Sequence, residues 1–410
     1  MDAMKTVDAH LADILRVVRP LDPVRLDLED ALGSVLAEDV ASPVALPPFD
    51  NSAMDGYAVR AGDVAGASED APVVLPVTVD VAAGDTSHRV VEPGSVTRIM
   101  TGAPVPEGAD AVVPVEWTDG GTVKVAIRRP PQAGNAIRRS GEDVRAGDVV
   151  LTAGTVIGPA QLGILAGVGR RAVLAHPRPR VVVLSTGTEL VEPGTPLGHG
   201  QIWESNSYTL VAAVRQAGGE AFRRGAVGDD PGAFSATLDA LLGEADAVIT
   251  SGGISMGAYE PVKEALSALG TVRFEKVAMQ PGMPQGFGVL GERRVPIFTL
   301  PGNPVSAYVS FVLYVKPALA RMRGLPAGPP AMVTAICGSA LRSPAGRRSF
   351  LRGVLTPAAP GGGPAGPTVS PVHGQGSHQL AALAGANALI MVPEDVTELP
   401  EGAPVEVIPL

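Results

Sequence analysis

The chain has 410 residues, 45% of them hydrophobic and 18% charged, a composition that excludes wholesale disorder and leaves room for several domains. The formal net charge of −10 argues against sequence-independent binding to nucleic acid or to anionic membranes. The single cysteine, Cys337, excludes an intrachain disulfide and any cysteine-based zinc or iron–sulfur site.

The first part of the chain is predicted to be helical and then to change to short strands. Apolar residues at helical spacing predict a helix over 4–19, which Pro20 ends, and a second helical stretch over 21–40. Over 57–150, short β-branched runs separated by Gly-Asp, Pro-Gly and Gly-Gly pairs indicate a small antiparallel β module. Helical spacing returns over 158–169.

From residue 180 the pattern becomes an alternation of buried strands and helices. Apolar strands are predicted at 181–184, 247–250 and 297–300, and helices at 207–217, 232–243, 261–269 and 305–323. Continuous apolar strands between helices are typical of a parallel sheet, so we predict an α/β domain over 178–325. Short β runs resume over 326–410, interrupted by a flexible Pro/Gly-rich stretch at 357–367.

The three predicted strands of this domain end in loops of small residues. Ligands of open parallel sheets bind at the carboxyl ends of the strands, and exposed backbone N–H groups there suit phosphate or another oxyanion. None of the loops has the Walker or dinucleotide-binding pattern, which argues against those two classes. The candidate binding residues are Ser185, Gly187, Ser251, Gly252, Gly253, Ser255, Pro301, Gly302, Asn303 and Pro304.

Charged residues accompany the loops. The carboxylates are Glu189, Asp229 and Glu260, together with Asp55 from an earlier loop. Several carboxylates near a phosphate site indicate a bound Mg²⁺, and the alternative is that they cap helices or are solvated. The candidate cations for an anionic ligand are Arg138, Arg139 and Lys276; for the two arginines, a solvated surface pair is the alternative.

The segments taken together resemble a known family. In the central domain these are Val183–Leu190 (VLSTGTEL), Asp246–Ser255 (DAVITSGGIS) and Leu300–Ser306 (LPGNPVS), which resemble molybdopterin-binding domains. Four further segments narrow the resemblance to the MoeA type of molybdopterin molybdenumtransferase, similar to the E domain of gephyrin: Pro48–Arg60 (PFDNSAMDGYAVR), Arg98–Pro104 (RIMTGAP), Gly141–Asp143 (GED) and Gly374–His378 (GQGSH).

The resemblance implies a multidomain α/β plus β architecture. It comprises a discontinuous helical and linker domain (1–45 and 143–177), a small β module (46–142), the molybdopterin-binding α/β domain (178–325) and a C-terminal, β-barrel-like domain (326–410). It also implies a homodimer. The charged N-terminal residues and the absence of a membrane-length apolar run lead us to expect a cytoplasmic protein.

The resemblance implies an enzyme of molybdenum cofactor biosynthesis. Such an enzyme binds adenylylated molybdopterin, inserts molybdate and releases AMP in the presence of Mg²⁺, and its candidate partners are an adenylyltransferase or apo-molybdoenzymes. The family's functional residues fall on Asp55, Thr101, Glu189, Asp229, Pro301, Pro304 and Ser377. We expect Asp55, Glu189, Asp229 and Glu260 to be the candidate metal ligands.

Three departures from the family pattern bear on function. Gln280 and Met283 stand where the family often has lysines, and Glu260 stands where many members have aspartate. Fewer cations weaken the attraction for an anionic ligand. Two alternatives stand beside the molybdotransferase hypothesis: a molybdopterin adenylyltransferase, because the central motifs are shared with that family, and a non-catalytic scaffold or carrier that binds molybdopterin, which the missing lysines favour.

Overall fold

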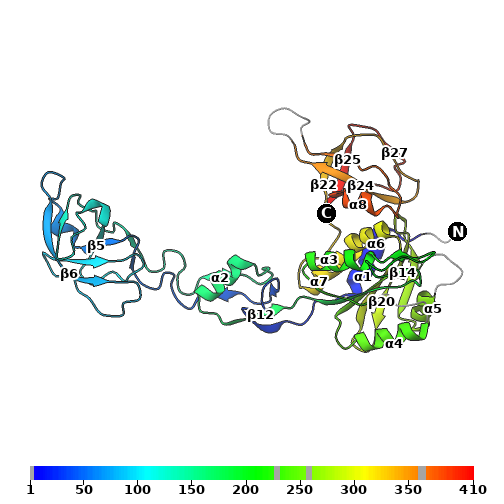
Figure 1. Ribbon diagram of the computed structural model, residues 1–410, viewed down its shortest axis with the longest axis horizontal. Helices are drawn as coiled ribbons and strands as arrows, with labels where there is room; N and C mark the ends of the chain where they lie inside the picture. Colours follow the sequence, from blue (N-terminus) through cyan, green and yellow to red (C-terminus); the bar gives the residue numbers. More distant parts are fainter. Residues whose placement is uncertain (1–3, 226–230, 255–260, 359–365) are drawn as a thin grey trace. The chain divides into compact units, whose positions relative to one another are not determined.

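A computed structural model describes residues 4–225, 231–254, 261–358 and 366–410, and the chain forms two compact units (Figure 1). The first unit contains Met1–Arg25, Gly33–Ala37 and Leu174–Leu410, and the second contains Leu26–Leu32 and Glu38–Val173. The predicted class, a multidomain α/β protein with additional β domains, is confirmed. The four domain boundaries predicted above stay a prediction.

The centre of the first unit is a six-stranded sheet with the order β16-β13-β17-β21-β20-β18. The first four strands are parallel, as predicted, whereas β20 and β18 join antiparallel, which the sequence analysis did not anticipate. The bounds are β16 Glu220–Arg223, β13 Arg180–Ser185, β17 Ala247–Ser251, β21 Val295–Leu300, β20 Pro284–Leu290 and β18 Val272–Lys276.

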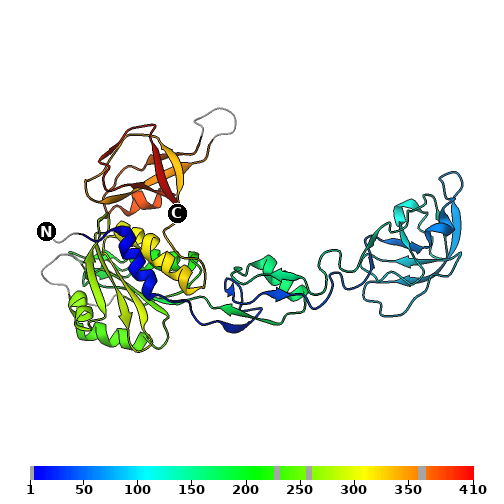
Figure 2. The ribbon, with the colours of Figure 1, turned by 180° about the vertical axis from the view of Figure 1, so that it is seen from behind.

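Helices cover both faces of this sheet (Figures 1 and 2). Alternate residues of a strand point to opposite faces, so Val181 and Val183 pack with one helical layer and Val182 and Leu184 with the other. The first layer contains α1 (Val7–Val17), α3 (Asn206–Gln216), α6 (Pro304–Ser310), a π-helical segment (Phe311–Val315) and α7 (Lys316–Met322). The second layer contains α4 (Pro231–Leu241) and α5 (Pro261–Ala268).

The helix predicted over 305–323 is confirmed as the continuous run of α6, the π-helical segment and α7. It has a widened turn because Pro317 has no N–H group to donate to the preceding turn. Gly324 follows with a φ of +73°, a left-handed conformation that ends the helix.

The second helical stretch predicted over 21–40 is wrong. The segment forms β1 (Val24–Asp27), β2 (Val35–Leu36) and β3 (Val40–Ala41) instead. Gly33 takes a φ of +80°, which interrupts a helix, and β2 pairs antiparallel with the distant β12 (Ala172–His176). Pairing with a remote strand therefore overrides the local helical spacing.

The C-terminal region forms a second six-stranded sheet, with the order β19-β24-β25-β22-β28-β26. An additional pairing between β24 and β26 closes the strands into the expected barrel. Strand β19 comes from the α/β domain, so it holds Gln280 beside the barrel. The bounds are β19 Met279–Gln280, β22 Val333–Cys337, β24 Arg348–Thr356, β25 Thr368–Pro371, β26 Ala388–Val392 and β28 Pro404–Pro409, with α8 at Leu380–Ala384 and the pair β23 Leu341–Arg342 and β27 Glu398–Leu399.

The second unit contains a five-stranded sheet with the order β8-β5-β7-β6-β9. The predicted antiparallel module is confirmed except for the pair β6 and β7, which is parallel. Its strands are β5 Gly56–Val59, β6 Val73–Val81, β7 Val96–Ile99, β8 Ala111–Pro114 and β9 Lys124–Ile127. The same unit contains β4 Asn51–Ser52, β10 Ile137–Arg138, β11 Val149–Leu151, the 3-10 turns Ala61–Val64 and Val115–Trp117, and α2 Pro159–Gly167, which confirms the helix predicted over 158–169.

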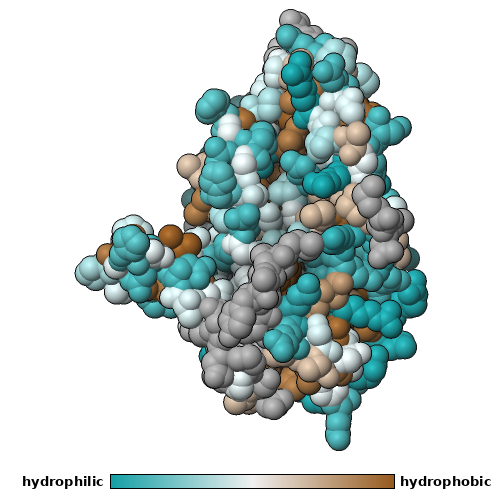
Figure 3. Space-filling model, turned by 90° about the vertical axis from the view of Figure 1, so that its right-hand side faces the viewer, coloured by the Kyte–Doolittle hydropathy of each residue, from teal (hydrophilic) through white to brown (hydrophobic). Residues whose placement is uncertain are grey.

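Two further features are the polarity of the surface of the first unit and the length of the helices. On the face of the first unit shown in Figure 3, hydrophilic side chains predominate and hydrophobic ones occur singly or in small groups. Within the described part of the chain, every helix is too short or too polar to cross a membrane.

Acid is expected to destabilise the first unit through His10 on α1. The ring is 3% exposed, its Nδ1 lies 3.2 Å from the Glu275 carboxylate, and it packs edge-on against Tyr314. Burial, and next the charge of Lys5, lower the pKa of His10 from 6.5 to about 4. Because folding then favours neutral histidine, its contribution to stability is complete above about pH 6.5 and is lost as the pH falls towards 4.

Urea unfolding at pH 7 and pH 5 measures this effect. We expect the wild type to lose about 2 kcal/mol of unfolding free energy between the two pH values through this one group. A His10→Gln variant should lose much less over the same interval. An equal loss in both proteins would contradict the assignment to His10.

Candidate functional site

The three small-residue loops lie side by side at one edge of the central sheet. Strands β13, β17 and β21 are neighbours, so their carboxyl ends meet there. The Thr186 N–H donates to the Ser251 carbonyl (2.9 Å), and the Gly252 N–H donates to the Leu300 carbonyl (3.1 Å). The structure therefore brings together the loop residues Ser185, Gly187, Ser251, Gly252, Gly253, Pro301, Gly302, Asn303 and Pro304.

Close backbone approach explains the glycine at position 252. Its φ is +98°, and a Cβ there would lie 2.4 Å from the Thr186 carbonyl oxygen, closer than side chains allow. Gly187 has a φ of +149°, and a Cβ on it would lie 2.5 Å from the Glu189 carboxylate. Larger residues would push the loops apart and close the space in front of them.

A cavity of about 990 Å³ opens in front of the loops. Its other walls come from the ribbon of β14 (Leu190–Val191) and β15 (Ile202–Trp203), from the segment after β19, and from the barrel. The lining residues outside the three loops include Glu189, Leu190, Ile202, Trp203, Asn206, Gln280, Pro281, Pro284, Arg347, Gln375, Ser377 and His378. The volume suits a ligand of nucleotide size or larger.

Asn206, which the sequence analysis missed, links two of the loops. Its Nδ2 donates to Ser251 Oγ (2.7 Å) and to the Gly302 carbonyl (2.6 Å) from the first turn of α3. These bonds hold the loop after β17 and the loop after β21 at a set spacing. An asparagine at the start of a helix suggests only a cap in the sequence.

Ser185 has a structural partner. Its hydroxyl donates to the Glu204 carboxylate (2.7 Å), which also accepts from the N–H and hydroxyl of Ser207. Glu204 is 2% exposed and lines the cavity, and its carboxylate is held by these three donors and by the Arg223 guanidinium 3.8 Å away. The bonds tie the end of β13 to the start of α3.

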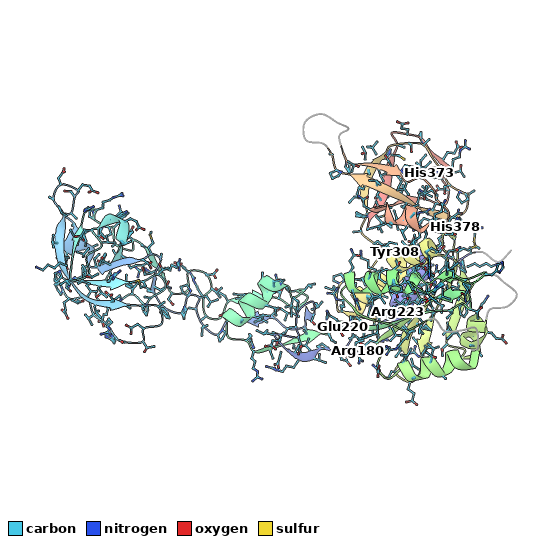
Figure 4. The ribbon with its side chains drawn as sticks, viewed as in Figure 1. Arg180, Glu220, Arg223, Tyr308, His373 and His378 are labelled. Atoms are coloured by element: carbon cyan, nitrogen blue, oxygen red, sulfur yellow. The ribbon has the colours of Figure 1, made fainter. Side chains whose placement is uncertain are left out.

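The barrel contributes Ser377 to the same cavity. Asn303 Nδ2 donates to Ser377 Oγ (3.0 Å), and the Val305 N–H donates to the Ser377 carbonyl (3.0 Å). Figure 4 shows the next residue, His378, between the barrel strands and the helix that carries Tyr308. A residue over 70 positions away in sequence therefore completes the wall beside the loop after β21.

The remaining residues predicted for this site differ in their position relative to the cavity, and three of them lie outside the described part of the chain. Lys276 is exposed at the end of the outer strand β18 and is absent from the described lining of the cavity. Glu189 lines the cavity, with its carboxylate folded over Gly187. Asp229, Ser255 and Glu260 lie outside the described residues.

A second cavity, of about 480 Å³, shares Gln280, Pro281 and Gln375 with the first and is lined by Arg352 from β24. The Arg352 side chain is fully buried. Its Nη2 donates to the Gly374 and Gly376 carbonyls (2.8 and 3.2 Å), whereas Nε and Nη1 have no hydrogen-bond partner. Burial lowers the pKa of the guanidinium, yet arginine stays charged in proteins.

Among the described residues, Arg352 is the arginine with two buried nitrogens that lack a hydrogen-bond partner, and sequence reasoning missed it. A buried charge without an acidic partner is costly unless an anion completes it. Arg352 therefore has the character of a receptor for a small anion. In the sequence it stands in GRRSFLRG, a segment that is more often an exposed strand face, and that interpretation is wrong for the buried Arg352.

In the second unit, the structure brings Asp55 and Thr101 together. The Asp55 carboxylate accepts from the Thr101 N–H (2.7 Å) and from the Thr101 hydroxyl (2.8 Å). These two hydrogen bonds, the backbone one first, lower the pKa of Asp55 below its ordinary value. Asp55 is exposed and ionised, so its free lone pairs face solvent.

The paired arginines differ in environment. Arg139 forms an ion pair with Asp50 (2.6 Å), and the Ser140 N–H donates to the same carboxylate (2.8 Å). Arg138 is exposed on β10, where its backbone pairs with Asn51 of β4. Of the two, Arg138 has the side chain that is available to an external anion.

The proposed metal ligands are not assembled within the described residues. There, no group of three or more histidine, cysteine, aspartate or glutamate side chains is placed to hold a metal ion. Glu189 nevertheless offers carboxylate oxygens beside the loops, and Mg²⁺ commonly uses one or two carboxylates and completes its shell with water and substrate phosphate. Glu189 fits such a role as a single ligand.

Comparisons with known proteins cover nearly the whole chain. Three family models match: the MoeA N-terminal region (domain I and II) at 5–169, a probable molybdopterin binding domain at 182–321, and the MoeA C-terminal region (domain IV) at 334–410. Molybdopterin molybdenumtransferase 2 of Mycobacterium tuberculosis is 48% identical, covering 98% of this chain and 99% of its own length. Molybdopterin molybdenumtransferase of Haemophilus influenzae is 37% identical, covering 99% and 98%. The crystal structure of a molybdopterin biosynthesis MoeA protein of Pyrococcus horikoshii has a TM-score of 0.78 at 32% identity, covering 99% of both chains.

Proposed function

This chain belongs to the MoeA family, and on that premise we propose that it is a transferase of molybdenum cofactor biosynthesis that inserts molybdate into molybdopterin. The proposal extends to finer points: the substrate is adenylylated molybdopterin, AMP is released, and Mg²⁺ is required. It also includes a cytoplasmic homodimer that receives its substrate from an adenylyltransferase and delivers its product to apo-molybdoenzymes.

The cavity in front of the three loops supports a substrate that carries phosphate. Backbone N–H groups in the glycine loops at Gly187 and Gly302 offer donors without a bulky side chain, whereas the Gly252 N–H already donates to the Leu300 carbonyl. Arg347 is the only lysine or arginine in the described lining of this cavity. A phosphoanhydride bound at the loops would accept hydrogen bonds from the backbone N–H groups and from the Arg347 guanidinium.

The observation that carries the insertion step is the buried, unsatisfied guanidinium of Arg352. Molybdate is a small tetrahedral dianion, and we propose that it accepts hydrogen bonds from the Nε–H and Nη1–H groups, which are buried and have no partner in the protein. The cavity that Arg352 lines shares residues with the substrate cavity, so the two anions would bind close together. Holding both reactants at adjacent sites makes their reaction effectively intramolecular.

The departures at Gln280 and Met283 fit this arrangement. Gln280 lines both cavities, and it provides an uncharged amide where the family often has lysine. We propose that Arg347 and Arg352 supply the positive charge that those positions lack. When bound beside Glu189, Mg²⁺ would neutralise the phosphate charge that develops as AMP leaves.

The test incubates the purified protein with adenylylated molybdopterin, Mg²⁺ and graded molybdate, and follows AMP. We expect AMP release that rises with molybdate and saturates, with tungstate in a parallel series as a measure of metal preference. AMP release that ignores molybdate would contradict insertion. Strong adenylylation of free molybdopterin with Mg-ATP would favour the adenylyltransferase alternative, and tight binding without turnover would favour the carrier.

A further inference from the structure

We infer that the indole ring of Trp203 is a stacking platform for a planar heteroaromatic ring of the ligand, either its pterin or its adenine. This inference rests on the proposed function, because it takes the cavity in front of the loops as the substrate site. Trp203 lies on β15, in the ribbon that forms one wall of that cavity.

The ring is held in place by its own ribbon. Trp203 pairs with Val191 of the parallel strand β14, and its Nε1 donates to the Thr195 carbonyl (2.8 Å). The polar edge of the indole is therefore satisfied inside the protein. What remains for a ligand is the apolar face of a ring that has already lost most of its freedom of rotation.

Two large apolar side chains on this wall are more exposed than tryptophan and isoleucine usually are. Trp203 is 52% exposed and its neighbour Ile202 is 54% exposed, and both line the cavity. The chain has only two tryptophans, and the aromatic rings in the described lining are those of Trp203 and His378. Large apolar side chains gathered at the wall of a polar cavity indicate a surface that a ligand covers.

The neighbouring aromatic residue shows the contrast. The Arg223 guanidinium lies 4.4 Å from the centre of the Tyr208 ring, and the Tyr208 hydroxyl donates to Glu192 (3.2 Å). Arg223 also forms an ion pair with Glu192, so this cluster is complete within the protein. Among the described residues, Trp203 has no ring or cation against its face.

The position of the ring relative to the loops matches a ligand with both phosphate and a heteroaromatic ring. Strand β14 begins three residues after Gly187, and the Ile202 N–H donates to the Glu189 carbonyl (2.9 Å). The ribbon therefore begins directly after the loop whose backbone N–H groups would bind phosphate. Stacking on an aromatic side chain tolerates different bases, so the same wall suits a pterin or an adenine.

Fluorescence tests the inference directly. In a Trp117→Phe background, Trp203 is the only tryptophan, and Trp117 lies in the separate β module beside Arg129. This protein is titrated with AMP, with pterin-6-carboxylate and with inorganic pyrophosphate. We expect saturable quenching of Trp203 by at least one of the ring compounds and none by pyrophosphate. In a second measurement, by calorimetry, Trp203→Ala should weaken binding of that compound about tenfold, whereas Trp203→Phe should retain most of the affinity.

The outcomes separate the two proposals. If Trp203→Ala weakens the binding of AMP alone, the wall is assigned to adenine. If it weakens the binding of pterin-6-carboxylate alone, the wall is assigned to pterin. Either result supports the inference. If Trp203→Ala binds both ring compounds as the parent does, the inference is overturned, and a change of sedimentation in that variant would instead assign the surface to a second copy. If the wild type shows ring-dependent quenching but no molybdate-dependent AMP release, the proposed function fails while the stacking platform stands.

Discussion

Replacing Arg352 with methionine is expected to raise the molybdate concentration for half-maximal AMP release about 100-fold or more. Nε and Nη1 of the guanidinium have no hydrogen-bond partner in the protein and would contact the oxyanion, and methionine fills a similar volume without any donor. Arg352→Lys should give an intermediate result, because it keeps the charge but loses the fork of donors.

The fold should tolerate this change. Removing a buried and incompletely paired charge relieves a desolvation cost, whereas losing the bonds to the Gly374 and Gly376 carbonyls opposes that gain. We therefore expect little change in the unfolding temperature. Activity lost together with the cooperative unfolding transition would indicate a structural role only.

Arg323 provides a matched control for the arginine experiment. It is also buried, also has an Nε without a hydrogen-bond partner, and donates to the Ala217 and Gly33 carbonyls. It is absent from the described lining of both cavities. Arg323→Met should leave the molybdate dependence unchanged, so an equal effect of both variants would contradict a specific role for Arg352.

Asp55→Ala is expected to lower the rate of molybdate-dependent AMP release at least about 100-fold without loss of the folded state. The carboxylate is exposed and ionised, and it holds Thr101 through two hydrogen bonds while its other lone pairs stay free. The family resemblance assigns a functional aspartate to this position, and because Asp55 is exposed its removal leaves no cavity in the core. AMP release by rapid quench and circular dichroism together measure the two effects.

Asp119 is the matched control for Asp55. It is an exposed carboxylate in the same β module, and it accepts hydrogen bonds from the backbone N–H groups of Gly121 and Ala126. As with Asp55, hydrogen bonding lowers its pKa. Asp119→Ala should retain wild-type activity. A fully active Asp55→Ala protein, or an Asp119→Ala protein that is equally impaired, would rule out a specific role for Asp55.

Much of the α/β domain could be predicted because its signals are local. The apolar strands at 181–184, 247–250 and 297–300 and the helices that follow them appear within a few residues of their predicted bounds. The meeting of the loops after β13, β17 and β21 followed from one rule, that neighbouring parallel strands end at the same edge.

Where the structure differs from the sequence prediction, the cause is contacts between residues that are far apart in the chain. The stretch around Leu26 to Leu36 has helical spacing, but Leu36 pairs with Ala175, so remote pairing decides its conformation. Lys276 lies near the predicted site in sequence, yet β20 separates its strand from β21. Two strand spacings amount to about 10 Å, which keeps a strand end away from its neighbours' loops.

By itself the sequence determined the fold class, the family resemblance and the three loops, since each depends on residue types at short spacing. Only the tertiary structure decided which of the glycines and charges matter. Gly252 is required by the Thr186 carbonyl, Arg352 is left unsatisfied by the barrel around it, and Trp203 is turned to a cavity wall by its ribbon. Burial and the lack of a partner depend on residues far away in the chain, and for this reason no local pattern could reveal them.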